Sequence, residues 1–181
     1  TMYKHTDVIY NDYADQRLLP QKYSQLGPFI STGDINKDCK TDFYIGGGFN
    51  SQGKIFTQQN HGSFSGKDFI PASKFTEDEA SVLFDADGDG DLDLLVTYGD
   101  TRYSDTSMFY HPELYLNDGK GNFTLSTNAI PSNVKTIAGS VAVADYNSAG
   151  YMDVFIGGRV SKQYPTSRSS YLLQNNKGTF T

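Results

Sequence analysis

The sequence repeats one unit three times, and this repetition limits the possible folds more than any other feature. Each copy contains a short apolar run, an Asp-rich loop, a second apolar run and then glycine. The copies span Phe29–Gly47, Val82–Gly99 and Val141–Gly158, and their first aspartates, Asp34, Asp85 and Asp145, lie 51 and 60 residues apart. A repeat of this length indicates an array of similar supersecondary units that stack on one another.

Each copy continues into a second matching piece that reads as strand, tight polar turn and strand. These pieces are Lys54–Phe64, Glu113–Phe123 and Tyr171–Phe180. In the second copy the four expected strands are 81–84, 92–98, 114–116 and 122–126. Four antiparallel strands in each repeat are typical of a β-propeller blade. A parallel β-helix would show shorter turns of near-constant length, and a sandwich gives no reason to repeat one acidic loop.

We therefore predict an all-β fold of about three four-stranded antiparallel blades that form part of a larger propeller. The 181 residues suit a single unit, and 18 glycines with 25 Tyr and Phe favour turns and strands. The expected parts are blade 1 at about 27–65, blade 2 at about 80–126, blade 3 at about 139–181 and an N-terminal segment at 1–26.

The repeated pattern also carries a family resemblance. The order of apolar strand, D-x-[DN]-x-D-G-x-x-D, apolar strand and Gly-Gly resembles the FG-GAP/VCBS repeat of integrin α-subunit propellers and many bacterial surface proteins. Five further stretches, 16–20, 26–28, 157–160, 164–165 and 170–173, resemble the VCBS-repeat region of bacterial proteins that often carry an ASPIC/UnbV module, although no segment matches that module itself. Closed propellers of this kind usually have about seven blades, so three would belong to a larger ring.

The acidic loop of the second copy predicts a calcium site. Asp85, Asp87 and Asp89 alternate along the chain, the Asp91 carbonyl adds an oxygen, and Asp93 closes the loop. Ca²⁺ takes six to eight oxygen ligands, and water can complete the shell. An EF-hand is excluded because apolar Val96 occupies the twelfth position, where that motif requires Glu. The alternative is an acidic turn without metal, which mutual repulsion of the carboxylates disfavours.

The first loop offers a second calcium site. It supplies Asp34, Asn36, Asp38, the Lys40 carbonyl and Asp42. Cys39 stands where the repeat has glycine, which strains the backbone if that position needs a positive φ. Its thiol is too soft to be a calcium ligand.

The third loop is the weakest of the three. It keeps Asp145, Asn147 and Asp153, but Ala149 replaces the carboxylate at position five. We interpret it as a turn that has lost most of its metal affinity. By carboxylate count, affinity should fall from the second loop to the first and then to the third.

Several classes of function find no support. The net charge of −6, without a basic stripe, disfavours nucleic acid, and no apolar run approaches the ~20 residues of a membrane span. A single cysteine excludes an intrachain disulfide, and the first five residues lack a signal-peptide core. His5, His61 and His111 are scattered, and no HExxH, GxSxG or P-loop motif occurs.

The loops between the second and third strands of a blade, here called B–C loops, are the expected partner site. They run over 100–112 in blade 2 and 159–170 in blade 3, and both are rich in Tyr, Arg and Ser. The alternative is that Tyr103, Phe109, Tyr110 and Tyr164 pack against neighbouring blades. The overall prediction is a non-catalytic, calcium-binding scaffold for a protein or carbohydrate partner at the cell surface, in the periplasm or outside the cell. The other hypothesis is part of a propeller lyase or hydrolase that acts on polysaccharide.

A three-blade array should expose unpaired faces at 3–13 and 141–181. Such faces favour self-association, which we expect near Val154, Ile156 and Leu172. The alternative is that the N-terminal segment, with Tyr3, Val8 and Ile9, folds back as a cap.

Overall fold

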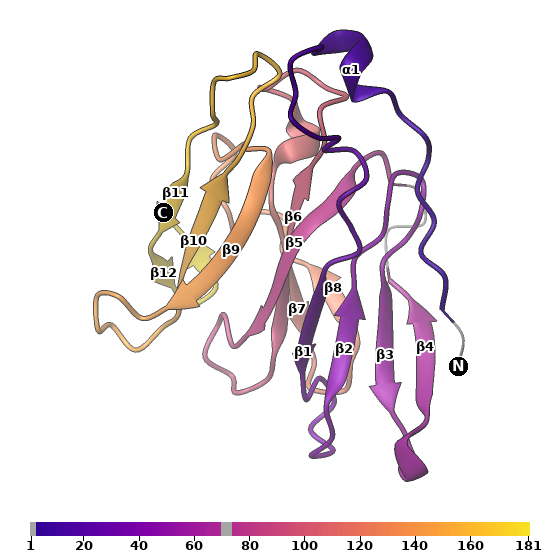
Figure 1. The fold of residues 1–181 in the computed structure, drawn as a ribbon. Helices are drawn as coiled ribbons and strands as arrows, with labels where there is room; N and C mark the ends of the chain where they lie inside the picture. The colour runs from indigo at the N-terminus through magenta and orange to yellow at the C-terminus, as the bar shows by residue number, and fades with distance from the viewer. Residues whose placement is uncertain (1–2, 70–73) are drawn as a thin grey trace.

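The described residues form four antiparallel sheets, which make up three blades that lie side by side (Figure 1). The computed structural model describes residues 3–69 and 74–181, so the first two residues of the predicted N-terminal segment lie outside it. Blade 1 has the strand order β1-β2-β3-β4, and blade 2 has the order β5-β6-β7-β8. Blade 3 has β9, β10 and β11, with a terminal hairpin of β12 and β13. The predicted all-β architecture of antiparallel blades is therefore confirmed, with four-stranded sheets in blades 1 and 2 and a three-stranded sheet with a separate hairpin in blade 3.

The elements have the following bounds. The strands are β1 (Ile30–Gly33), β2 (Asp42–Ile45), β3 (Lys54–Gln58), β4 (Phe64–Asp68), β5 (Glu77–Phe84), β6 (Asp93–Gly99), β7 (Glu113–Asn117), β8 (Phe123–Leu125), β9 (Ala138–Ala144), β10 (Asp153–Gly158), β11 (Tyr171–Leu173), β12 (Asn175–Asn176) and β13 (Thr179–Phe180). The helical pieces are α1 (Asp12–Asp15) and the 3₁₀ turns η1 (Asn60–Gly62) and η2 (Met108–Tyr110).

The register is the same in all three blades, because the last aspartate of each acidic loop begins the second strand. Asp42 pairs with Gly33, Asp93 with Phe84 and Asp153 with Ala144. Alternate residues point to opposite faces of a strand, so this shared register decides which side chains face each neighbouring blade.

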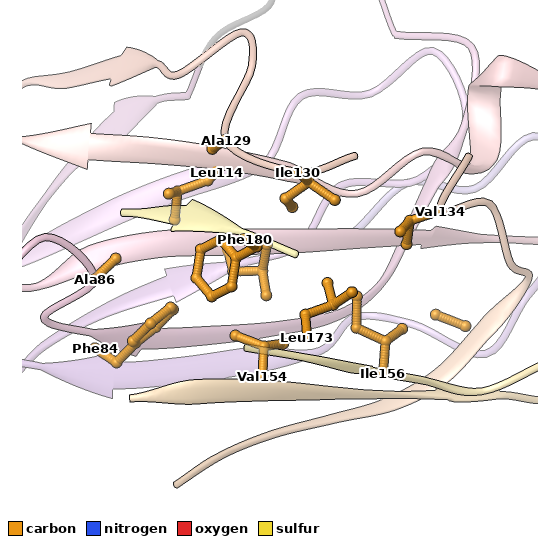
Figure 2. Close-up of a cluster of buried hydrophobic side chains, with 12 residues drawn as sticks. Phe84, Ala86, Leu114, Ala129, Ile130, Val134, Val154, Ile156, Leu173 and Phe180 are labelled. Carbon is orange, nitrogen blue, oxygen red and sulfur yellow. The ribbon is translucent and has the colours of Figure 1, made fainter. Parts of the chain in front are cut away.

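The hydrophobic core lies between the blades. Leu94 and Val96 of β6 belong to the cluster shared with blade 1, whereas Leu95 between them belongs to the cluster shared with blade 3. In Figure 2 the side chains of Phe84 and Leu114 meet those of blade 3. Since blade 2 is apolar on both faces, its second strand reads as a continuous apolar run.

One prediction about the open face of blade 3 is wrong. Val154 and Ile156 are buried in the cluster with blade 2, so they do not lie at an exposed contact. The exposed side chains belong instead to Phe155 and Leu172, which are paired with each other across β10 and β11.

The N-terminal segment crosses the end of the blades that carries the B–C loops, above which α1 lies in Figure 1. Asp12 is buried and accepts hydrogen bonds from the Ser24 and Thr101 hydroxyls, each at 2.6 Å. The Tyr3 ring packs edge-on against Phe56 of blade 1, with centroids 5.7 Å apart. Tyr3 therefore covers part of blade 1, as a cap would, but Ile9 stays exposed.

Candidate metal centre

The three acidic loops share one backbone conformation at the end of the blades opposite α1 (Figure 1). Each has a positive φ at the position of Gly90, where φ is 83°, and the matching residues are Cys39 at 63° and Gly150 at 88°. Each also has a positive φ two residues earlier, at Lys37, Gly88 and Ser148. The position of Cys39 therefore does need a positive φ, which is the condition under which backbone strain was expected there.

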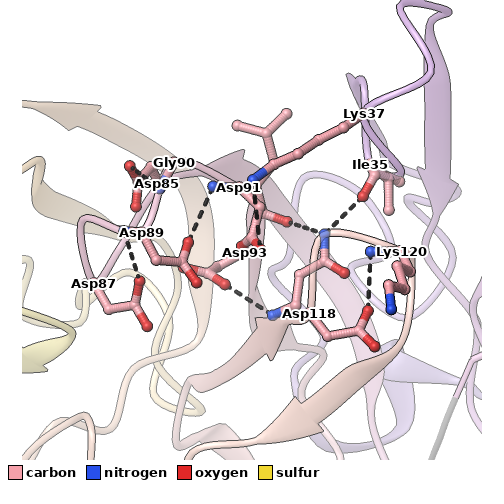
Figure 3. Close-up of polar contacts among 12 residues, drawn as sticks. Ile35, Lys37, Asp85, Asp87, Asp89, Gly90, Asp91, Asp93, Asp118 and Lys120 are labelled. Carbon is pink, nitrogen blue, oxygen red and sulfur yellow. Dashed lines mark hydrogen bonds and ion pairs between the residues drawn. The ribbon is translucent and has the colours of Figure 1, made fainter.

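The second loop gathers three carboxylates at one point. Asp85, Asp87 and Asp89 each place an oxygen within 4.8 Å of the others (Figure 3). Asp85 accepts hydrogen bonds from the amides of Gly88 at 2.7 Å and Gly90 at 3.0 Å, so the turn itself aims this carboxylate inward. Repelling charges at such range favour a cation among them.

Asp93 closes the second loop from a buried position. Its Oδ2 accepts from the Ala86 amide and its Oδ1 from the Asn117 amide, both at 2.9 Å. Burial raises the pKa of Asp93 to about 6. Asp42 accepts hydrogen bonds in the same way from the amides of Ile35 and Gln58. Asp153 accepts them from the amides of Tyr146 and Asn175. The closing aspartates therefore join the loop to the third strand in blades 1 and 2, and to β12 in blade 3.

The side chain of Asp91 reaches toward the neighbouring blade. It is buried, its Oδ2 lies 3.9 Å from Lys37 Nζ of the first loop, and burial raises its pKa to about 6. Its Oδ1 has no hydrogen-bond partner among residues 3–69 and 74–181. Sequence reasoning assigned only the carbonyl of Asp91 and missed this contact, because nothing in the repeat pattern brings Lys37 to it.

The first loop gathers Asp34, Asp38 and Asp42, whose oxygens also lie within 4.8 Å of one another. The Asn36 side-chain oxygen accepts from the Asp38 amide at 3.1 Å, which orients it toward the same turn. Lys40 differs from its equivalents in the other loops, because its ammonium group lies 2.8 Å from Asp38 Oδ2. Its hydrogen bond holds the pKa of Asp38 below the usual value.

The third loop has the same turn without the same charge. Asp145 accepts from the amides of Ala149 at 2.9 Å and Gly150 at 2.8 Å, and Asn147 accepts from Ala149 at 2.8 Å. Within the described part of the chain, groups of three acidic or other metal-binding side chains occur in the first two loops alone.

The donors in the first two loops are carboxylate, amide and carbonyl oxygens. Hard cations such as Ca²⁺ prefer this set, whereas softer transition metals prefer imidazole or thiolate. The residues present therefore fit calcium. Cys39 is exposed in the first loop, and its thiol adds no suitable donor.

The opposite end of the molecule carries the B–C loops and a buried polar network. Glu77, Asp78 and Glu79 are consecutive and buried. They form ion pairs with Arg102, Lys74 and Arg159, which come from three different segments. Burial raises the pKa of both Glu77 and Glu79 to about 8. This network joins the loops to the blades.

Two open hollows lie beside this network. One, of about 230 Å³, lies between 15–18 and 162–164, and the other, of about 410 Å³, lies between 104–106 and 162–163. Tyr110 is fully buried and Tyr103 packs near it, so the packing alternative holds for these two residues. Phe109 and Tyr164 remain exposed. No helix in the described residues is long and apolar enough to cross a bilayer.

The comparison with known proteins agrees with this geometry. No curated protein matches the sequence. A family model described as an FG-GAP-like repeat matches residues 34–96 and 85–156, each match beginning at the first aspartate of an acidic loop. Together the matches cover residues 34–156, about two thirds of the 181 residues. The chain therefore belongs to the FG-GAP-like repeat family, with the blades and loops described above as its repeats.

Proposed function

We propose that the protein is a calcium-binding, non-catalytic β-propeller scaffold that presents a partner site on its B–C loops. The observation that carries the proposal is the pair of three-carboxylate clusters in the equivalent loops of two blades. Calcium in these loops would neutralise the charge beside the inter-blade core and hold the turns rigid. The third loop would bind it most weakly.

The partner would be a protein or a carbohydrate. Supporting this are the two hollows and the exposed Phe109 and Tyr164, since exposed aromatic rings on loops are common at interaction sites. Repeats of this family are typical of extracellular and surface proteins, so we place the scaffold at the cell surface, in the periplasm or outside the cell.

Calcium should stabilise the fold. A ligand bound by the native state alone adds about 2.7 kcal/mol at a hundredfold excess over Kd. Thermal unfolding followed by circular dichroism should therefore show a lower Tm in EDTA than in calcium. An unchanged Tm, with metal analysis confirming that the EDTA-treated protein is empty, would show that the loops are metal-free turns.

The loops can then be ranked by calorimetric titration. Asp87→Ala should remove more calcium binding than Asn147→Ala, its equivalent in the third loop, because the second loop has the higher carboxylate count. The reverse order would contradict charge count as the basis of affinity. A glycan array combined with a turnover assay on the same glycans tests the partner site, and turnover would favour the enzyme hypothesis.

A further inference from the structure

A further hollow, of about 150 Å³, lies at the end of the molecule that carries the B–C loops. It lies between η2 in the B–C loop of blade 2 and residues 74–76, which lead into β5. Blade 2 packs against blade 1 on one face and against blade 3 on the other. The hollow therefore belongs to a blade that has both of its neighbours in this chain.

The mouth of the hollow is apolar and aromatic. Phe75, Met108 and Phe109 line it and are 50%, 57% and 43% exposed. The centroids of the Phe75 and Phe109 rings are 6.1 Å apart, and the rings are tilted by 54°. Ring contacts continue on both sides, because Phe49 lies 6.5 Å from Phe75 and Tyr103 lies 4.4 Å from Phe109. These four rings, called here the aromatic row, offer flat apolar surface at the hollow and beside it.

The half-buried Glu113 gives the hollow a fixed hydrogen-bond acceptor. It begins β7, and the alternation of side chains along a strand places it on the same face as Tyr115. Its Oε2 accepts hydrogen bonds from the hydroxyls of Tyr98 and Tyr115, each at 2.5 Å. Within residues 3–69 and 74–181 its Oε1 accepts no hydrogen bond, and its carboxylate forms no ion pair. The two tyrosines thus hold the carboxylate in place and leave one oxygen for a ligand.

His111 gives the hollow a second acceptor. Its Nδ1 lies 2.9 Å from the Val134 carbonyl oxygen. A carbonyl can only accept, so Nδ1 carries the hydrogen, and the neutral ring presents Nε2 as an acceptor. No donor among the described residues bonds to Nε2. Two acceptors without donors therefore line the same hollow.

The charges around the hollow disfavour an ionic ligand. Lys74 lines it from a buried position, with Nζ 2.6 Å from Asp78 Oδ1 and 2.8 Å from the Gly47 carbonyl. A cationic ligand would meet the ammonium group of Lys74, and an anionic ligand would meet the carboxylate of Glu113. A neutral ligand that carries hydroxyl donors avoids both repulsions and supplies both acceptors with hydrogen bonds.

We propose that this hollow binds one ring of a neutral oligosaccharide. One face of the sugar stacks on the Phe75 or Phe109 ring, and two of its hydroxyls donate to Glu113 Oε1 and His111 Nε2. A sugar ring combines an apolar C–H face with a rim of hydroxyls, which matches aromatic walls with a few placed polar groups. The rest of the aromatic row suits the neighbouring sugars of the chain. The inference rests on the proposed partner site at the B–C loops and names a neutral carbohydrate as the partner.

A glycan array of neutral, acidic and amino oligosaccharides tests the ligand class, and calorimetric titration with a neutral glycan that binds then tests the site. Phe75→Ala and Phe109→Ala should each weaken binding roughly tenfold, as loss of a central contact does. Both side chains are exposed, so the fold should survive, which circular dichroism checks. Tyr146→Ala is the matched control, because it removes an exposed aromatic ring in the third acidic loop, at the opposite end, and should leave the affinity unchanged.

Salt and ligand chemistry give two independent measurements. The affinity should stay constant when NaCl rises from about 0.05 to 0.5 M, because no ion pair holds a neutral sugar. Deoxy analogues of the bound sugar should reveal two hydroxyls whose removal weakens binding roughly fivefold or more, since each leaves an acceptor unpaired. Glu113→Gln, which replaces one acceptor by an amide, should abolish the sensitivity to one of these hydroxyls.

The opposite results overturn the proposal. Preference for acidic or amino glycans, or a tenfold loss of affinity in high salt, would show that recognition is ionic. Neutral-glycan binding that survives both Phe variants would place the sugar elsewhere, and its loss in Tyr164→Ala would assign it to the hollow beside that residue. An array without any bound neutral glycan would exclude this ligand. The calcium dependence of Tm would still test the scaffold, so failure here is distinct from failure of the proposed function.

Discussion

At the scale of single residues, Cys39 shows how a comparison of the repeats reveals a strained backbone position. Aligning the three loops places it opposite Gly90 and Gly150, and its φ of 63° confirms that the position is left-handed in all three. The left-handed conformation costs an L-residue roughly 1–2 kcal/mol relative to the right-handed conformation, whereas glycine adopts it freely.

Cys39→Gly should therefore stabilise the protein by about 0.5–1 kcal/mol, because glycine's larger unfolded-state entropy offsets part of the relieved strain. Urea unfolding in EDTA measures this without a contribution from calcium. Gly90→Ala is the matched control and should destabilise, since a Cβ there meets no atom within 4 Å and only the φ of 83° opposes it. A loss of stability in Cys39→Gly would show that the cysteine side chain makes a compensating contact.

The repeat pattern predicted the residues of the acidic loops better than it predicted the side chains that contact them. The alternating aspartates of the second loop converge as the spacing indicated. The Lys37–Asp91 contact and the Lys40–Asp38 pair depend on how two loops and one flexible side chain lie in space, which no spacing encodes. Metal binding by the closing aspartates, Asp42, Asp93 and Asp153, stays a prediction. Each of them already accepts hydrogen bonds from two backbone amides.

At the scale of elements, the four strands predicted for blade 2 match the structure to within one residue at every end except the start of the first strand. Strand β5 begins at Glu77, four residues before the predicted Ser81. Consecutive Glu77, Asp78 and Glu79 look like a loop, because burying three acids is costly without partners. Arg102, Lys74 and Arg159 supply those partners, and the register shift between Asp78 and Ala80 interrupts the regular alternation.

The side chain of Asn117, which hydrogen-bonds blade 2 to the Ile35 carbonyl of blade 1, should contribute measurably to stability. Asn117→Ala removes the bonds to the Ile35 and Leu92 carbonyls and leaves buried backbone groups without partners, which costs about 2–3 kcal/mol. Urea unfolding measures this as a lower midpoint. Asn122→Ala is the control, because Asn122 bonds only exposed Asp118 through its side chain and should change stability by less than about 0.5 kcal/mol. Equal effects of the two variants would mean that blade packing does not need the hydrogen bonds of the Asn117 side chain.

At the scale of the whole molecule, the two ends of the blades have opposite roles. The acidic loops concentrate exposed negative charge at one end, whereas the other end buries its acids against basic side chains. Lys74 comes from the link between blades 1 and 2, Arg102 from the B–C loop of blade 2 and Arg159 from the start of the B–C loop of blade 3. Arg102 also lies over the Tyr10 and Phe49 rings, at 4.9 and 4.2 Å. The network therefore joins all three blades to the N-terminal segment.

This network predicts that global stability falls as the pH rises from about 5 to 8. Burial raises the pKa of Glu79 to about 8 from its ordinary value of 4.5, so between these values the folded protein binds a proton that the unfolded chain has released. Unfolding then becomes easier with rising pH, by up to about 1.4 kcal/mol per pH unit for this group. Urea unfolding in EDTA at pH 5, 6.5 and 8 measures the slope.

Glu79→Gln isolates the contribution of this carboxyl group to the pH dependence. Glutamine resembles the protonated acid, so the variant should match wild-type stability most closely at pH 5 and gain on it steadily toward pH 8. Arg159 is partly exposed and can be solvated when its partner is neutral. A variant whose stability relative to wild type falls toward pH 8 would show that the ion pair with Arg159 outweighs the cost of burying the charge, and that Glu79 is ionised in the folded protein.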